Sequence, residues 1–185
     1  MNWSWIPNAI TLARVLASLP LFWLLVHGQY LPAFWLAVAA GISDALDGIL
    51  AKSCGWQSVL GGVLDPIADK LLLNTCFLGL WWTLHLPTWL VALVLGRDLV
   101  ILVGAWAWWR LSGAFKPDPS GISKATTLAQ LLLVGLLLSH LAGYELGIRW
   151  LPGLALATAA ITLLSGLDYV LRYGVRAWRR LGKGE

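Results

Sequence analysis

Four aspartates lie in strongly apolar sequence and form two pairs, Asp44 with Asp47 and Asp65 with Asp69. A carboxylate in the middle of a membrane-spanning helix costs about 3 kcal/mol on insertion scales, so all four need compensation from cations, water or protein groups. Residues three or four apart share one face of a helix, so each pair can present two carboxylates together. Carboxylate oxygens suit Mg²⁺, Mn²⁺ or Ca²⁺ better than zinc. The pairs therefore predict a divalent-metal site between two helices.

Glycines flank both acidic pairs. Gly48 follows the first pair directly, and Gly61 and Gly62 precede the second. A residue without a side chain lets another helix or a ligand approach the backbone closely. Pro66 follows Asp65 and removes one helical hydrogen bond, which kinks a helix or frees a carbonyl near the acids.

The spacing from Asp44 to Asp69 reads D-x2-D-G-x2-A-K-x8-G-x3-D-x3-D. This closely resembles the signature of the CDP-alcohol phosphotransferase family, integral membrane enzymes that make phospholipids from CDP-activated precursors. One position departs from that signature, because Lys52 stands where the family usually has arginine. The positive charge is kept, and the bidentate fork of a guanidinium is lost.

The resemblance implies a site with two divalent ions, Mg²⁺ or Mn²⁺, and a reaction that releases CMP. Asp44, Asp47 and Asp65 would be metal ligands, and Asp69 would bind the second metal and serve as general base. The cytidine and pyrophosphate pocket would be lined by the remaining signature positions: Gly48, Ala51, Lys52 and Gly61.

The composition indicates a polytopic membrane protein. Of 185 residues, 59% are hydrophobic and only 12% are charged, whereas soluble domains have about a quarter charged. Cys54 and Cys76 have no C-x-x-C spacing, so we interpret them as packing residues. The first residues lack a basic region before the apolar run, so we expect no cleavable signal peptide.

Six apolar stretches are long enough to cross a bilayer, which takes about 20 residues each. We predict one all-α domain over residues 1–185, a bundle of six membrane-spanning helices with a short N-terminal surface helix that contains Trp3 and Trp5. The predicted spans are 9–27, 31–52, 60–84, 87–109, 123–143 and 149–171. An even number of spans places both termini on one side.

The basic residues indicate which side that is. Nearly all of them fall at one set of loops and ends, and the opposite loops carry only Arg149. By the positive-inside rule both termini, including the basic tail 172–185, are cytoplasmic. The active site would then face the cytoplasm, and the membrane would be a bacterial inner or plasma membrane. The net charge of +4 suits anionic lipid rather than nucleic acid. The histidines fall at the opposite face, where we interpret them as interfacial polar residues: His27, His85 and His140.

The segment after Pro7 is similar to the P-N-x-x-T-x-x-R opening of phosphatidylglycerophosphate synthases and related cardiolipin synthases. Asn8, Thr11 and Arg14 fall on one helical face, and the resemblance assigns Asn8 and Thr11 to the nucleotide and Arg14 to the acceptor. Inside a span Arg14 needs an anion, either the aspartates or a bound phosphate. The alternative is an arginine that snorkels to water at the helix end.

Two further cations, Arg97 and Lys124, match family positions that bind the polar head of the acceptor. The segment 122–130 resembles I-G-K-x-K-T-x-x-Q of phosphatidylglycerophosphate synthases, with Ser123 in place of the glycine and Thr126 in place of the second lysine. The loss of the second lysine, together with the Arg97-Asp98 pair, favours cardiolipin synthases. Fewer cations suit phosphatidylglycerol, because this acceptor carries less phosphate charge than glycerol 3-phosphate. We also interpret Asp168 and Arg172 as a structural i, i+4 pair.

The leading hypothesis is an enzyme that transfers a phosphatidyl group from CDP-diacylglycerol to a glycerol-type acceptor, preferably phosphatidylglycerol. Glycerol 3-phosphate is the alternative acceptor. An intramembrane cation transporter is disfavoured because the four signature acids cluster at one face, and a catalytically dead scaffold because every acidic signature position is intact. The resemblance also implies a homodimer.

Overall fold

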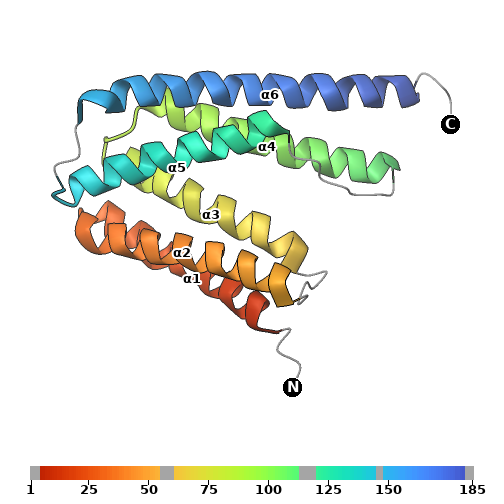
Figure 1. Cartoon of the computed structure of the whole chain (residues 1–185). Coiled ribbons are helices and arrows are strands. Elements are labelled where there is room, and N and C mark those ends of the chain that lie inside the picture. Colours follow the sequence, from red (N-terminus) through yellow and green to blue (C-terminus); the bar gives the residue numbers. More distant parts are fainter. Residues whose placement is uncertain (1–4, 55–60, 113–119, 145–147, 182–185) are drawn as a thin grey trace. The chain divides into compact units, whose positions relative to one another are not determined.

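The computed structural model describes residues 5–54, 61–112, 120–144 and 148–181. Side chains are described only for residues 11–43, 68, 70–107, 110, 120–144 and 149–172. Within these ranges the chain is all-helical, as predicted, and Figure 1 shows the helices in chain order. They are α1 (Trp5–Val26), α2 (Tyr30–Cys54), α3 (Gly61–Trp82), α4 (Thr88–Ser112), α5 (Gly121–Leu141), a 3₁₀ turn (Ile148–Trp150) and α6 (Leu151–Leu181).

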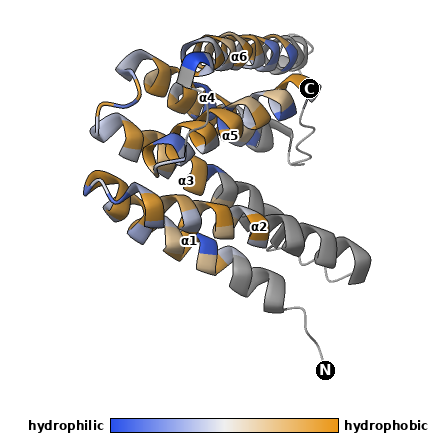
Figure 2. Ribbon diagram, turned by 60° about the vertical axis from the view of Figure 1, so that its left-hand side comes forward, coloured by the Kyte–Doolittle hydropathy of each residue, from blue (hydrophilic) through white to orange (hydrophobic). Residues whose placement is uncertain are grey.

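Each α-helix coincides with one of the six predicted spans. Among the residues whose side chains are described, three segments are long and apolar enough to cross a membrane, namely Thr88–Ala107, Gly121–Leu141 and Leu151–Arg172. Two shorter apolar stretches, Thr11–Val26 and Tyr30–Ser43, lie in α1 and α2. Figure 2 shows apolar residues along all of the labelled helices. On α4 and α6 many large side chains are exposed, including Leu99, Leu102, Leu163 and Leu167. This distribution is typical of helices that meet lipid.

The predicted separate surface helix is not present in the described residues. Trp5 begins α1, and this helix continues through Pro7 to Val26 without a break. A proline in the first helical turn lacks only an N–H that has no partner in the helix, so Pro7 does not interrupt α1. Trp3 lies outside the described residues.

The chain divides into two compact units. Unit 1 comprises Met1–Leu86 and Val134–Ile148, and unit 2 comprises Pro87–Leu133 and Arg149–Glu185. In unit 1, α1 packs against both α2 and α3 (Figure 1). The buried face of α1 repeats every three or four residues, as a helix face must. It consists of Thr11, Arg14, Ser18, Leu21 and Leu25.

In unit 2, α4 packs against α6 in a parallel orientation. Arg97 contacts Ser165, and four residues further along both helices Tyr169 Oη donates to the Ile101 carbonyl at 3.1 Å. The antiparallel contact between α5 and α6 uses two threonines. Thr126 Oγ1 bonds the Ile161 carbonyl at 3.3 Å, and Thr158 Oγ1 bonds the Ala129 carbonyl at 3.4 Å. Small polar residues join membrane helices in this way because lipid offers their hydroxyl groups no partner.

Candidate active site

The structure places the two acidic pairs on two consecutive helices of unit 1, α2 and α3. Asp44 and Asp47 lie in the second half of α2, and Asp65 and Asp69 lie in the first turns of α3. Their side chains are outside the described set, so only the position of their backbone is known. The same holds for five other predicted site residues: Asn8, Gly48, Ala51, Lys52 and Gly61.

The turn between α1 and α2 fixes the register of these two helices. Gly28 adopts a φ of 70°, and its N–H donates to the Leu25 carbonyl at 3.1 Å, which closes α1 with a left-handed glycine cap. Because α2 starts at Tyr30, residues equally far from this short turn lie at similar levels. Thr11 is fifteen residues before Val26 (26 − 11), so it lies level with Ala45, fifteen after Tyr30 (45 − 30).

A close contact fixes the register of α1 against α3. A Cβ atom at Gly79 would lie 2.6 Å from Leu25 Cδ1, so these two residues are in direct contact. α1 and α3 run parallel (Figure 1). Thr11 lies fourteen residues before Leu25 (25 − 11), and Asp65 lies fourteen before Gly79 (79 − 65). Equal offsets along parallel helices give equal rise, so Thr11 is level with Asp65. By the same count Arg14 is level with Ala68, which is fully buried.

These two registers bring the four aspartates close to the level of Thr11 and Arg14. The four aspartates fall level with residues 9 to 15 of α1, a rise of about 9 Å at 1.5 Å per residue. Thr11 and Arg14 lie in the same interval and are buried, with 1% and 3% of their surface exposed. A snorkelling arginine would reach water, so this burial argues against that alternative for Arg14. A buried guanidinium needs an anion, and the aspartates are at its level.

Unit 2 holds a second polar cluster, centred on Arg97. Its Nη1 donates to Asp98 Oδ1 at 2.8 Å, and its Nη2 donates to Ser123 Oγ at 2.6 Å and to Ser165 Oγ at 2.7 Å. All of these groups are buried or half-buried. The cluster therefore joins α4, α5 and α6. Sequence reasoning missed Ser165, because a single serine in an apolar helix belongs to no motif.

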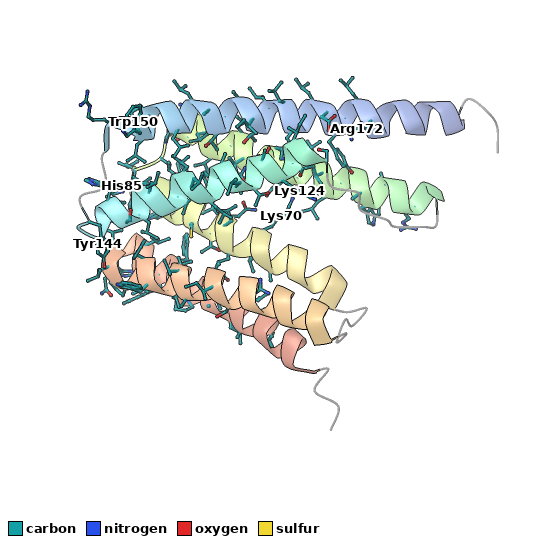
Figure 3. All side chains as sticks on the ribbon, viewed as in Figure 1. Lys70, His85, Lys124, Tyr144, Trp150 and Arg172 are labelled. Carbon is teal, nitrogen blue, oxygen red and sulfur yellow. The ribbon has the colours of Figure 1, made fainter. Side chains whose placement is uncertain are left out.

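Lys124 lies in the first turn of α5 and is exposed (Figure 3). Ser120 caps this helix, since its Oγ accepts the Ser123 N–H at 3.2 Å. Lys124 thus lies at the positive end of the α5 dipole. The charge of the lysine and the partial positive charge of the helix end together favour a bound anion.

Two other sequence interpretations concern unit 2. Thr126 is fully buried, and its Oγ1 also donates to the Ile122 carbonyl at 2.8 Å, so this position faces α6. The predicted pair of Asp168 and Arg172 is confirmed, with Arg172 Nε 2.6 Å from Asp168 Oδ1. Figure 3 shows Arg172 on α6.

Comparison with known proteins identifies the family. The model of the CDP-alcohol phosphatidyltransferase family matches residues 4–166, which include both acidic pairs, the α1 face and the Arg97 cluster. The chain belongs to the CDP-alcohol phosphatidyltransferase family. The resemblance found in the signature is therefore confirmed over most of the chain.

Relatives within the CDP-alcohol phosphatidyltransferase family differ in their acceptor. A chloroplastic CDP-diacylglycerol–glycerol-3-phosphate 3-phosphatidyltransferase of Oryza sativa is 33% identical over 91% of this chain and 56% of its own length. A cardiolipin synthase (CMP-forming) of Streptomyces coelicolor is 34% identical over 90% of this chain and 81% of its own length. A CDP-diacylglycerol–glycerol-3-phosphate 3-phosphatidyltransferase of Aquifex aeolicus is 30% identical over 90% of this chain and 94% of its own length.

The length of these matches varies. The chain spans just over half, 56%, of the rice relative and of a probable cardiolipin synthase (CMP-forming) of Drosophila melanogaster. Relatives with each acceptor have similar identity to this chain, so overall similarity does not choose between glycerol 3-phosphate and phosphatidylglycerol.

Proposed function

We propose that this chain is an integral membrane phosphatidyltransferase, which transfers a phosphatidyl group from CDP-diacylglycerol to a glycerol-type acceptor and releases CMP. One observation carries this proposal. The complete acidic signature lies on α2 and α3 of a family member, at the level of the buried residues Thr11 and Arg14 of α1. Charged groups gathered at one level of apolar helices are a mark of function, because each is costly in a bilayer.

The four aspartates suit the divalent ions that the family generally uses. In our proposal Asp44, Asp47 and Asp65 hold two Mg²⁺ or Mn²⁺ ions together with Asp69, which also accepts the proton of the acceptor hydroxyl. Four carboxylates offer enough hard oxygen ligands for two such ions. When bound, the ions neutralise the pyrophosphate and polarise the phosphorus under attack. Among the side chains that the structure describes, which exclude the four aspartates, no group of three His, Cys, Asp or Glu residues could hold a metal.

The remaining site residues divide between nucleotide and acceptor. We assign the cytidine and pyrophosphate to the signature positions and to α1, namely Asn8, Thr11, Gly48, Ala51, Lys52 and Gly61. We assign the acceptor head group to Lys124 and Arg14, with Arg97 contributing from its buried position. Phosphatidylglycerol is the favoured acceptor, since a single phosphodiester needs fewer cations than a terminal phosphate. Glycerol 3-phosphate is the alternative.

The location of the enzyme follows from its charge pattern. We propose six membrane spans with both termini cytoplasmic, so that the site opens to the compartment that supplies CDP-activated lipid. The proposed membrane is a bacterial inner or plasma membrane, and the proposed assembly is a homodimer, both on the family resemblance.

A CMP-release assay tests the proposal. Purified full-length protein would be given CDP-diacylglycerol, Mg²⁺ or Mn²⁺, and either phosphatidylglycerol or glycerol 3-phosphate, and the lipid product would be identified. We expect CMP and cardiolipin with phosphatidylglycerol, and Asp69→Asn should abolish both. The matched control is Asp168→Asn, which removes an aspartate that pairs with Arg172 within α6, and its turnover should persist. Turnover that persists in Asp69→Asn, as it does in the control, would contradict the role of Asp69.

Removal of the metal provides an independent test. A chelator such as EDTA should stop CMP release, and added Mg²⁺ or Mn²⁺ should restore it, because the aspartates alone repel the pyrophosphate. Continued turnover after dialysis against the chelator would overturn the metal assignment. Binding of Mn²⁺ to the protein without substrate can be followed by electron paramagnetic resonance, and Asp69→Asn should weaken it.

A further inference from the structure

Among the described residues, the Arg97 guanidinium has three hydrogen-bond partners, which differ in their exposure. Nη1 donates to Asp98 Oδ1 at 2.8 Å, and Nη2 donates to Ser165 Oγ at 2.7 Å and to Ser123 Oγ at 2.6 Å. Asp98 and Ser165 are buried, with 5% and 2% of their surface exposed. Ser123 is half-buried and lies in the first turn of α5. Of the three partners, Ser123 is therefore the one that a ligand arriving from solvent can displace.

The Ser123 hydroxyl is not needed for the hydrogen bonds of α5 itself. The Ser123 N–H donates to Ser120 Oγ at 3.2 Å, and its carbonyl accepts from Thr127 Oγ1 at 3.3 Å. Both bonds use backbone atoms of Ser123, so they remain when its side chain is shortened. Within the part of the chain that the structure describes, Ser123 Oγ bonds only to Arg97 Nη2. The hydroxyl is therefore available for a role in the Arg97 cluster.

An anion bound at the start of α5 would lie beside this bond. Lys124, the residue after Ser123, is exposed (Figure 3), and the first turn of α5 adds the partial positive charge of a helix N-terminus. Arg97 adds a third positive charge, because it bonds the residue that precedes Lys124. The Ser123 hydroxyl thus holds one guanidinium hydrogen that a phosphate at the start of α5 would otherwise accept.

We propose that Ser123 determines the acceptor specificity of this enzyme, by holding one Arg97 hydrogen that a terminal phosphate needs. A phosphate that contacts Arg97 through Nη2 on this side must take the place of the Ser123 hydroxyl. Asp98 and Ser165 meanwhile keep the guanidinium in position. The replacement breaks a hydrogen bond to a charged group, which weakens acceptor binding. This inference rests on the proposed function, with Arg97 and Lys124 as acceptor contacts.

The loss on replacement differs between the two candidate acceptors. A terminal phosphate, as in glycerol 3-phosphate, carries about two negative charges and three free oxygens. The phosphodiester of phosphatidylglycerol has a single charge and one fewer free oxygen, so Lys124 and the helix end satisfy a larger part of it. The terminal phosphate therefore depends more on the hydrogen that Ser123 holds. In the similar segment of phosphatidylglycerophosphate synthases this position is a glycine, which offers Arg97 no hydroxyl.

Removal of the hydroxyl tests the inference in the CMP-release assay. The measured quantity is kcat/KM for glycerol 3-phosphate divided by kcat/KM for phosphatidylglycerol. In Ser123→Gly and Ser123→Ala we expect this ratio to rise about tenfold, the usual effect of a hydrogen bond to a charged group. The kcat/KM for phosphatidylglycerol should change less than about threefold. Agreement between the two variants excludes an effect of glycine flexibility.

Two variants are matched controls. Ser123→Thr keeps a hydroxyl at the same position and should retain the acceptor preference of the unmodified protein. Thr127→Ala removes the hydroxyl one turn further along α5, which donates to the Ser123 carbonyl. Its acceptor preference should also be unchanged. A shift in Thr127→Ala as large as that in Ser123→Ala would attribute the effect to the start of the helix and contradict the inference.

Binding without turnover separates failure of this inference from failure of the proposed function. Isothermal titration calorimetry of the purified protein in detergent would use two soluble ligands, glycerol 3-phosphate and glycerophosphoglycerol, the head group of phosphatidylglycerol. In Ser123→Ala the Kd for glycerol 3-phosphate should fall about tenfold, and that for glycerophosphoglycerol should change less than about threefold. This result would support the inference even if neither acceptor gives CMP release.

Three results would overturn the inference. An unchanged ratio of the two dissociation constants would show that Ser123 does not discriminate between the ligands. Weaker binding of glycerol 3-phosphate to Ser123→Ala would show that the hydroxyl itself binds the acceptor. If glycerol 3-phosphate bound to neither the unmodified protein nor the variants, a terminal phosphate would have no place at the start of α5.

Discussion

Three arginines in the helices have different surroundings. Arg172 forms a half-exposed pair with Asp168, within one helix. Arg97 is buried and paired with Asp98 and two serines. Arg14 is buried at the level of the four signature aspartates. An exposed pair contributes little to stability, whereas loss of a buried charge leaves its partners uncompensated. The same residue type is therefore expected to have very different mutational effects.

Substitution of Arg14 should separate these cases. Arg14→Met removes a positive charge near the acidic pairs, and we expect kcat/KM for CMP release to fall about 100-fold, or roughly 2.7 kcal/mol of transition-state stabilisation. Arg14→Lys keeps the charge and should recover part of the activity. Arg172→Met is the control, with activity near that of the unmodified protein. Equal losses in Arg14→Met and Arg172→Met would indicate a general dependence on charge and contradict a role of Arg14 in the site.

The packing of α1 on α3 depends on a glycine. A methyl group at Gly79 would lie 2.6 Å from Leu25 Cδ1 and 2.7 Å from Leu25 Cβ, so the two helices would have to move apart. We expect Gly79→Ala to destabilise the protein by about 1–3 kcal/mol, the usual cost of overpacking. Gly135→Ala on α5 is the matched control, because nothing lies within 4 Å of its added methyl group. Thermal unfolding in detergent would compare the two, and an unchanged midpoint for Gly79→Ala would contradict the close contact.

The turn after α3 contains a strained residue. Leu84 has a φ of 60°, and its N–H donates to the Trp81 carbonyl at 2.9 Å. Left-handed backbone costs a non-glycine residue about 1 kcal/mol, and the Leu84 side chain is 89% exposed, so little packing offsets this. Leu84→Gly should raise the unfolding free energy by up to about 1 kcal/mol. Leu84→Ala keeps the strain and should show no gain, whereas equal gains would attribute the effect to the leucine side chain.

The helices and their approximate ends could be predicted from the apolar runs, because each run has the length that a bilayer requires. The level of the acidic pairs could not, since it depends on the Gly28 turn and on the contact of Leu25 with Gly79. The partners of Arg97 were also beyond prediction. Ser123 and Ser165 are far from Arg97 in sequence and meet it only through the packing of three helices. A surface helix separate from the first span does not include Trp5, because the first turn of a helix tolerates proline and α1 runs from Trp5 through Pro7 without a break.

The two units carry complementary parts of the proposed chemistry. Unit 1 contains the acidic signature with Thr11 and Arg14, and unit 2 contains Arg97 and Lys124. In our proposal the metals and the nucleotide are assigned to residues of unit 1, whereas acceptor residues occur in both units, Arg14 in unit 1 and Lys124 in unit 2. The rice relative is named for CDP-diacylglycerol and glycerol 3-phosphate, and the Streptomyces relative is named as a CMP-forming cardiolipin synthase.

The proposed membrane topology can be tested with the two native cysteines. Cys54 lies in the segment that we predict to be cytoplasmic, and Cys76 is buried in α3 and should not react. A membrane-impermeant maleimide should label the protein in inside-out vesicles and not in right-side-out vesicles. Cys54→Ser should lose this label. In that background Arg149→Cys, at an exposed position before α6, should be labelled only in right-side-out vesicles. Labelling of positions 54 and 149 from the same side would contradict the six-span arrangement, because three predicted spans separate them (60–84, 87–109 and 123–143) and an odd number of spans places two positions on opposite faces.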